Sequence, residues 1–350
     1  MSRANVQTMS EPACGPSRLI QEVFDQDRCS VCGACVNRCP YYAYHRGRVV
    51  VRDRCTLEEG SCYAFCPMAG ARGGFEGELG PHKKVIIARS NLRDMRKRGQ
   101  SGGVVSTMVH LALQDGLVGE AVLTSGHPED PPHGVRVTTR GQIAACAGSR
   151  YAQSGVVSVL NQALAEPSKT KLLMVGTPCQ IKAASAMRQA PPESVPFNPK
   201  RIGLLIGLFC TWALDYRSLS KYLRFMLFGE RASGYDIPPP PADVFMVKTG
   251  DGLKAFPLEE IRKLRLNACR FCDDMTSTMA DVSVGTVEGL DGWNTVIIRT
   301  SRGEKLVKKA EADNLITVDI LPKDDLEHLK EAAAGKKERG QSAWAENGAA

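Results

Sequence analysis

The larger part of the chain, from about residue 82 onward, alternates short apolar runs with segments whose apolar residues recur three or four positions apart. The uninterrupted runs predict buried strands at 85–88, 121–123, 172–175 and 202–209. The helical spacing predicts helices at 103–114, 154–164 and 181–187. This alternation is typical of an α/β domain with a largely parallel sheet. Ligands of such domains bind where loops leave the carboxyl ends of the strands.

The region before residue 82 is dominated instead by closely spaced cysteines. The run Cys29-x2-Cys32-x2-Cys35-x3-Cys39-Pro40 has the spacing of bacterial-type ferredoxins, in which three thiolates bind one four-iron cluster and the fourth binds its neighbour. By this logic Cys66, in a second run that also ends in proline, completes the first cluster. The sequence therefore predicts a 4Fe-4S cluster bound by Cys29, Cys32, Cys35 and Cys66.

The second cluster site is less regular, because the spacing Cys55-x6-Cys62-x3-Cys66 lacks one cysteine of a full repeat. Cys39, Cys55 and Cys62 then supply only three thiolates. Three arrangements remain open, namely a 3Fe-4S cluster, a 4Fe-4S cluster with Glu58 or Glu59 as an oxygen ligand, and a 4Fe-4S cluster that captures Cys14. A free thiol is the plainer interpretation of Cys14.

Four further cysteines lie in the larger domain. Cys179 and Cys210 each follow an apolar strand, and Cys269 and Cys272 form a CxxC loop. Four thiolates from separate loops can complete an all-cysteine site, for which zinc would also serve. Because ferredoxin-type clusters lie nearby in the chain, a third four-iron cluster is the favoured interpretation.

These patterns divide the chain into parts. We expect a flexible leader at 1–24, a bacterial-type ferredoxin domain at 25–80 with a short hairpin at 41–51, and a larger α/β domain at 81–325. The glycine-rich stretch 70–80 indicates the linker between the two domains. Residues 326–350 form a charged end that we expect to be disordered or to contact a partner.

Charge and composition narrow the class of protein. The net charge of +7 lies partly in short basic clusters without interleaved aromatic residues, which argues against single-strand nucleic-acid binding and fits a solvated face or a partner-docking patch. The longest apolar stretch, 202–214, is too short to span a membrane, and the first residues lack the apolar core of a signal peptide. With 13 cysteines, an odd number, reduced thiols in the cytoplasm are expected.

Two glycine-rich loops precede predicted helices and could bind a phosphate. They are Gly99-Gln100-Ser101-Gly102-Gly103 and Gly148-Ser149-Arg150-Tyr151. Unpaired N–H groups at a helix N-terminus attract anions. A glycine at the start of a helix serves structure equally well, so each loop is weak evidence alone. The acidic pair Asp273-Asp274 and Asp281 fit either helix capping or a ligand role.

In this order, the stretches GQSGGVVS, AGSRYAQS, GTPCQIKA, IGLFC, NACRFCDD, ADVSVG and GWNTVIIRTSRG resemble the beta subunits of the hydrogenases and formate dehydrogenases that use the deazaflavin coenzyme F420. The resemblance spans about residues 83–310. It implies an FAD-binding α/β domain with one 4Fe-4S cluster, preceded here by a two-cluster ferredoxin segment. It further implies that FAD is lined by Ser101, Gly102, Gly103, Gly148, Ser149, Arg150, Tyr151 and Thr177, beside the cluster of Cys179, Cys210, Cys269 and Cys272.

The resemblance implies an oxidoreductase subunit that exchanges hydride with a soluble carrier at FAD and relays electrons to a catalytic partner of hydrogenase, formate dehydrogenase or heterodisulfide-reductase type. No catalytic side chain is needed for hydride transfer to flavin. Many members carry an acidic residue soon after the GLFC cysteine, where this chain has Thr211-Trp212-Ala213-Leu214. This departure leaves the carrier open between coenzyme F420, which is the family default, and NAD(P)H. An electron-transfer adaptor without coenzyme turnover and a stand-alone reductase of a small organic substrate also fit the sequence.

Overall fold

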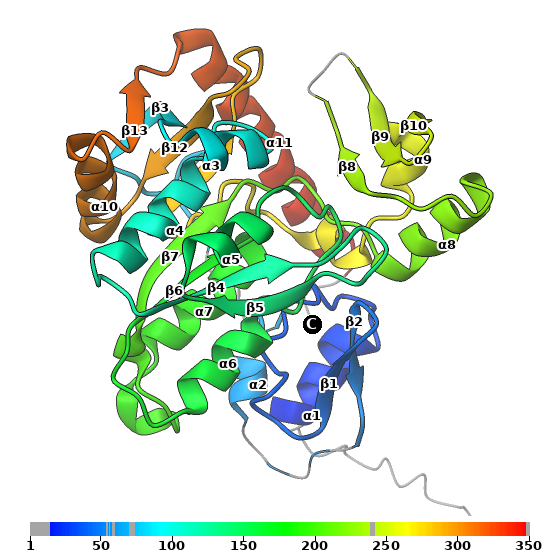
Figure 1. Cartoon of the computed structure of the whole chain (residues 1–350). Coiled ribbons are helices and arrows are strands. Elements are labelled where there is room, and N and C mark those ends of the chain that lie inside the picture. The colour runs from blue at the N-terminus through cyan, green and yellow to red at the C-terminus, as the bar shows by residue number, and fades with distance from the viewer. Residues whose placement is uncertain are drawn as a thin grey trace, which may run out of the picture.

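The computed structural model describes residues 15–53, 55, 57, 60–69, 74–238 and 242–347. They form a large mixed sheet with helices on both faces, a cysteine-rich N-terminal domain against one face, and a small antiparallel sheet that projects from one side (Figure 1). Among the described residues, no helix is long and apolar enough to cross a membrane.

The large sheet has eight strands, and its centre is parallel whereas its flanks are antiparallel. The parallel pairs join β11 to β7, β7 to β6 and β6 to β4, and the other four neighbouring pairs are antiparallel. The expectation of a largely parallel sheet is thus right only for the centre, since short connections such as β11 to β12 can join only antiparallel strands. In spatial order the strands are β13 (Ile316–Asp319), β3 (Lys84–Ser90), β12 (Asn294–Ile298), β11 (Val282–Thr286), β7 (Ile202–Leu208), β6 (Leu172–Gly176), β4 (Glu120–Ser125) and β5 (His133–Val137).

Helices cover the two faces of this sheet and enclose two apolar cores. One core joins the strands to α3 (Arg93–Arg98), α4 (Val104–Gln114), α5 (Arg140–Ala145) and α10 (Ser301–Ala312). The other joins them to α6 (Val157–Ala165), α7 (Pro178–Gln189) and part of the N-terminal domain. The four predicted strands correspond to β3, β4, β6 and β7, and the three predicted helices to α4, α6 and α7. These predictions are confirmed.

The N-terminal domain begins earlier than its sequence indicates. Residues expected to be part of a flexible leader form α1 (Gly15–Leu19) and a π-helical turn η1 (Ile20–Phe24), whose Leu19 and Val23 side chains are buried beside the cysteines. The rest of the leader lies outside the described residues. The expected hairpin is confirmed as β1 (Tyr42–His45) paired with β2 (Arg48–Val51), and α2 (Ser61–Ala64) follows.

The structure contains a small antiparallel sheet that was not predicted from the sequence. It has the order β10-β9-β8 and packs with α8 and α9 around Phe245, which is fully buried. Its strands are short and lie next to a run of prolines in the sequence, so they show no clear alternation of apolar and polar residues. The elements are α8 (Tyr216–Met226), β8 (Gly234–Asp236), β9 (Val244–Thr249), β10 (Gly252–Pro257) and α9 (Leu258–Arg262).

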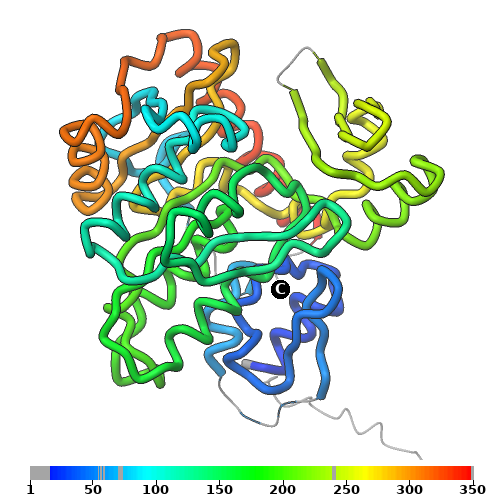
Figure 2. Tube along the Cα trace, in the orientation of Figure 1, coloured from blue at the N-terminus to red at the C-terminus, as the bar shows by residue number. Residues whose placement is uncertain are grey.

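The described part of the charged C-terminal segment is helical, so the disorder that was one of its two expected states does not hold there, and the contact with a partner stays a prediction. It forms the 24-residue helix α11 (Lys323–Glu346), which packs against the 3-10 helix η4 (Asn267–Phe271). The tube in Figure 2 shows this last helix passing beside the segment that carries the CxxC loop. The side chains that α11 buries, Ala333, Lys336 and Ala343, are small or polar, so no apolar stripe marked them. Two further 3-10 turns, η2 (Pro192–Ser194) and η3 (Pro199–Arg201), lie before β7.

Candidate functional site

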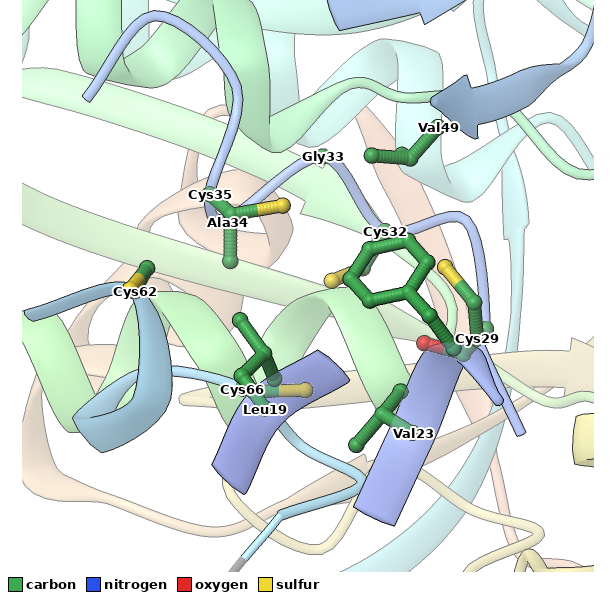
Figure 3. Close-up of a pocket in the computed structure, with 12 residues that line it drawn as sticks. Leu19, Val23, Cys29, Cys32, Gly33, Ala34, Cys35, Val49, Cys62 and Cys66 are labelled. Carbon is green, nitrogen blue, oxygen red and sulfur yellow. The ribbon is translucent and has the colours of Figure 1, made fainter. Parts of the chain in front are cut away.

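The first cysteine set lines a cavity inside the N-terminal domain. Figure 3 shows the sulfur atoms of Cys29, Cys32, Cys35 and Cys66 directed toward a common space. The apolar side chains of Leu19, Val23 and Val49 wall this space. A nonpolar chamber with four converging thiols has the donor set and the shielding that a four-iron cluster needs.

Burial keeps these thiols from ionising unaided. It raises the pKa of Cys29 to about 11 and that of Cys32 to about 12, and the thiols of the same set act on one another. The pKa values of Cys35 and Cys66 lie well above the ordinary range for the same reason. Because thiolates are the ligands of iron, only bound metal would stabilise them in this chamber. A cluster bound here would supply the positive charge that the four thiolates need.

The second set lies next to the first. Burial raises the pKa of Cys62 to about 11, with further contributions from the thiols of Cys39 and Cys55, which shows that the three are near neighbours. Tyr42 lies beside cysteines of both sets in one apolar cluster. Burial raises the pKa of its hydroxyl, and the nearby thiols of Cys62 and Cys35 raise it further. The fourth-ligand candidates Glu58, Glu59 and Cys14 lie outside the described residues.

The third set is brought together by the carboxyl ends of the central strands. Cys179 lies in the first turn of α7 directly after β6, and Cys210 follows β7. Cys269 lies in η4 and Cys272 immediately after it. Burial raises the pKa of Cys179 and of Cys269 to about 12, and the thiol of Cys272 contributes to both. Burial likewise raises the pKa of Cys210, with contributions from the other three cysteines.

Polar groups also reach the third set directly. The Gln153 Nε2 donates a hydrogen bond of 2.9 Å to the Cys179 Sγ, and the backbone N–H of Ala213 donates one of 3.3 Å to the Cys269 Sγ. Hydrogen bonds to cysteine sulfur are among the factors that tune cluster potentials. Neither Gln153 nor Ala213 was singled out from the sequence, because no spacing rule marks a donor to sulfur.

The three sets follow one another in space. The thiol of Cys179 contributes to the raised pKa of Cys29, and the thiol of Cys32 contributes to that of Cys179. The first and third sets are therefore adjacent across the domain boundary. Since Tyr42 joins the first and second sets, the order is second, first, third.

The spacing within the sets differs from that of a mononuclear site. Among the described residues, no three His, Cys, Asp or Glu side chains gather closely enough to hold one metal ion. In a four-iron cluster each thiolate binds a different iron, so the thiols need not meet at one point.

The two glycine-rich loops meet through Gln100. The backbone N–H of Ser149 donates to the Gln100 Oε1 at 3.1 Å, and the Gln100 Nε2 donates to the Tyr151 hydroxyl and to Asp236 of β8. Sequence reasoning missed the side chain of Gln100 as the link and missed Asp236. Ser101 beside it is half-buried and Ser149 is exposed.

The glycines that open α4 are required by contacts within the chain. Gly103 has a φ of +73°, and a Cβ there would lie 2.8 Å from the Met95 carbonyl oxygen. A Cβ at Gly102 would lie 2.7 Å from the Asn294 Oδ1. These close approaches account for both glycines without a ligand, so their expected contact with FAD stays a prediction.

Arg150 is the residue of the second loop whose side chain keeps a hydrogen-bond donor that no described protein atom accepts. Its Nη1 donates to the carbonyl oxygens of Ala147 and Gly148 at 3.2 and 3.1 Å, whereas its buried Nε has no hydrogen-bond partner. Burial also lowers the pKa of Arg150. Gly148 next to it is left-handed, with a φ of +91°. A phosphate group of a dinucleotide fits this donor set.

Thr177 connects the loops to the third cysteine set. Its hydroxyl oxygen accepts a hydrogen bond of 3.2 Å from the Gln153 Nε2, the same group that reaches Cys179. Thr177 also begins α7 through a capping box with Gln180. Of the expected flavin residues, Thr177 thus contacts the same Gln153 side chain that reaches the third cysteine set.

Two of the acidic residues that fitted either a capping or a ligand role, Asp274 and Asp281, make structural contacts, and the role of Asp273 stays a prediction. The Asp274 carboxylate accepts hydrogen bonds from the backbone of Thr276 and Thr278. Asp281 is fully buried and forms an ion pair with Arg188 at 2.6 Å. Trp212, in the loop after Cys210, packs partly buried against the core of the small sheet and so fills space there.

Comparison with known proteins agrees with this architecture. The family model for the C terminus of the coenzyme F420 hydrogenase/dehydrogenase beta subunit matches residues 169–323. The corresponding N-terminal model matches 85–161, and a 4Fe-4S binding domain matches 22–45. Together the two models of the beta subunit cover more than half of the 350-residue chain.

Individual relatives and one solved structure are also similar. The chain is 33% identical over 268 residues to the beta subunit of coenzyme F420 hydrogenase from Methanothermobacter thermautotrophicus, covering 75% of this chain and 94% of that protein. It is 31% identical over 326 residues to the F subunit of F(420)H(2) dehydrogenase from Methanosarcina mazei, covering 88% and 89%. A chain of the F420-reducing [NiFe] hydrogenase complex from Methanosarcina barkeri superposes with a TM-score of 0.69 at 27% identity, covering 77% of this chain and 94% of that chain. The chain therefore belongs to the family of coenzyme F420 hydrogenase/dehydrogenase beta subunits and carries a 4Fe-4S binding domain in front of the family domain.

Proposed function

We propose that this chain is the flavin and iron–sulfur subunit of a multisubunit oxidoreductase. In this role it exchanges a hydride with coenzyme F420 at FAD and relays single electrons to or from a catalytic partner. The observation that carries the proposal is the row of three cysteine sets, whose third member adjoins Thr177 and Gln153 next to the loop of Arg150. Such a row is what a short electron path through protein requires.

Each set has a part in this proposal. Cys29, Cys32, Cys35 and Cys66 would hold the first 4Fe-4S cluster, and Cys179, Cys210, Cys269 and Cys272 would hold the third. Cys39, Cys55 and Cys62 would hold the second, as a 3Fe-4S cluster or a 4Fe-4S cluster with a further ligand. The second set lies at the far end of the row from the Arg150 loop, so it is the proposed exit toward the partner.

The chain's own residues would position the flavin rather than react. Bound FAD would supply the conversion between hydride transfer and single-electron transfer, which a cluster cannot perform. The unpartnered Nε of Arg150 and the exposed side chain of Ser149 would bind its pyrophosphate. The loop of Ser101, Gly102 and Gly103 would line the opposite side of the pyrophosphate, because Gln100 hydrogen-bonds this loop to Ser149.

The carrier and the partner are inferred from relatives. The similar proteins are named as subunits of F420 hydrogenase and F(420)H(2) dehydrogenase, which supports coenzyme F420 as the carrier and a separate catalytic subunit as the partner. None of the cysteines in the described part of the chain forms a disulfide, which supports a reducing compartment such as the cytoplasm.

Anaerobic purification followed by cofactor counting tests the proposal. We expect FAD, at least two four-iron clusters, and reduction of a dye by reduced coenzyme F420. NADH and NADPH are assayed in parallel. A preparation without FAD would refute the flavin role. Dye reduction by NADH or NADPH alone would replace the carrier, and cofactors without any dye reduction would favour an electron-transfer adaptor.

Replacing Cys269 by serine tests the third cluster separately. We expect Cys269→Ser to lose about four irons per chain, because a cubane that lacks one thiolate in a buried site is not retained. The ferredoxin-type clusters should remain, as measured by iron content and by electron paramagnetic resonance. Cys146→Ser is the matched control, because Cys146 is partly buried at the end of α5 and away from the three sets. Equal iron content in the two variants would contradict the assignment.

A further inference from the structure

Helix α11 places a lysine side chain inside the third cysteine set. Lys336 is only 3% exposed, and its Nζ donates a hydrogen bond of 2.6 Å to the carbonyl oxygen of Cys210. The helix comes close enough for this contact because of Gly340, one turn further on. A Cβ at Gly340 would lie 2.8 Å from the Cys272 carbonyl carbon, so only glycine allows the approach. Trp344 fixes the same end by donating a hydrogen bond of 2.8 Å to the Phe271 carbonyl oxygen.

The buried ammonium group has no carboxylate that balances its charge directly. Within the described residues, Lys336 takes part in no ion pair of 4.0 Å or less. Asp274 is in the vicinity and forms no ion pair with Lys336, and its two carboxylate oxygens accept hydrogen bonds from Thr276 and Thr278. A buried cation without an adjacent counter-charge is strongly unfavourable. The other groups around Lys336 are the thiols of Cys210, Cys269 and Cys272, which would carry negative charge as thiolates of a bound cluster.

The neighbouring lysine shows the contrast. Lys337 points away from the cysteines, since its Nζ donates to the carbonyl oxygens of Phe75 and Gly77 and lies 4.5 Å from the centre of the Phe75 ring. Two adjacent lysines of one helix thus have different surroundings. One faces the linker before the large domain, and the other faces the third set.

We propose that Lys336 supplies a fixed positive charge that raises the reduction potential of the cluster bound by Cys179, Cys210, Cys269 and Cys272. The inference rests on the proposed third cluster. Uptake of one electron adds one negative charge to the cluster, and a nearby cation in a low-dielectric interior stabilises the reduced form more than the oxidised form. Lys336 makes no contact that would bind iron, so it is a positioning residue for charge rather than a ligand.

The test is a redox titration of the holoprotein, followed by electron paramagnetic resonance, with dithionite as reductant. For Lys336→Met and Lys336→Gln we expect the reduction equilibrium constant of the third cluster to fall at least tenfold, a shift of about 59 mV to lower potential for one electron. Lys336→Arg keeps the charge and should retain a potential near that of the unmodified protein. Lys337→Met is the matched control and should leave the potential unchanged, as should the signals of the ferredoxin-type clusters.

Each result decides the question. An unchanged potential in a neutral variant that keeps its iron would overturn the inference, and so would an equal shift in Lys337→Met. If the neutral variants lose the third cluster while Lys336→Arg keeps it, the charge is required and the inference stands. Loss in Lys336→Arg as well would show that the side chain acts by shape, which overturns it. Absence of a third cluster from the unmodified protein would refute the proposed function instead, which separates the two failures.

Discussion

Gly103 illustrates how strongly one residue can be constrained at the entry to a helix. It is left-handed and lies against the Met95 carbonyl at the beginning of α4. A left-handed conformation costs an L-residue about 1–2 kcal/mol, and the close contact adds to this cost. We therefore expect Gly103→Ala to lower the free energy of unfolding by more than about 1–2 kcal/mol, measured by denaturant unfolding.

Gly116 provides the control for that substitution. It is also left-handed, with a φ of +65°, but a Cβ there would meet no atom within 4 Å. Gly116→Ala should show the conformational cost alone. Equal losses of stability in the two variants would mean that the contact with Met95 has no energetic effect.

Single residues also explain why parts of the site were predictable and others were not. The cysteines could be singled out because the first two sets follow ferredoxin-type spacing and the third follows apolar strands and a CxxC loop, and the structure gathers all three expected sets within the residues it describes. Gln100, Gln153 and Lys336 were missed, because each acts through hydrogen bonds to groups far away in the sequence. Nothing in their immediate neighbourhood marks such a contact.

At the scale of elements, α11 depends on closely packed small residues. Gly340 lies against the backbone of Cys272 and Asp273, with would-be Cβ distances of 2.8 and 2.9 Å. We expect Gly340→Ala to push the helix outward, at a cost typical of overpacking, about 1–3 kcal/mol. The melting temperature and the iron content of the third site should both fall.

Gly335 in the same helix is the matched control. A Cβ there would meet only the Arg339 Nη1, at 3.2 Å, and this is the mobile end of a long side chain. Because alanine is favoured over glycine in helices by about 1 kcal/mol, Gly335→Ala should keep or raise the melting temperature. A drop of similar size in both variants would show that the helix is sensitive everywhere rather than at its contact with Cys272.

The predictability of an element followed the size of the residues that it buries. Strands β6 and β7 bury runs of leucine, isoleucine and valine, so the sequence marks them clearly. Helix α11 buries alanine, glycine and lysine, which resemble a solvated segment, and it was expected to be disordered or to contact a partner. The parallel centre of the large sheet was predictable, whereas its antiparallel flanks depend on pairings that no local pattern reveals.

At the scale of the whole molecule, Asn161 joins the ferredoxin domain to the large domain. It is 2% exposed in α6, and its Nδ2 donates to the carbonyl oxygens of Ala34 and Val36 at 2.9 and 2.8 Å. Its Oδ1 accepts from the Arg38 Nη2 at 2.8 Å. Replacing it by leucine leaves buried polar groups unpaired, at about 1–3 kcal/mol for each group.

We expect Asn161→Leu to let the ferredoxin domain unfold first. Its cluster absorbance should bleach at a lower denaturant concentration than the large domain unfolds, whereas in the unmodified protein the two events should coincide more closely. Gln162→Leu, on an exposed position of the same helix, is the control. Coincident midpoints in Asn161→Leu would show that the interface is held elsewhere.

The position of α11 has a consequence for how the protein is made. This helix follows every cysteine of the three sets along the chain, yet it lies against Cys210 and Cys272. The ribosome therefore delivers all four cysteines of the third set before the helix that covers them. Docking of Lys336 against Cys210 is then a late contact of the folding chain, and the proposed cluster would be enclosed only when α11 docks.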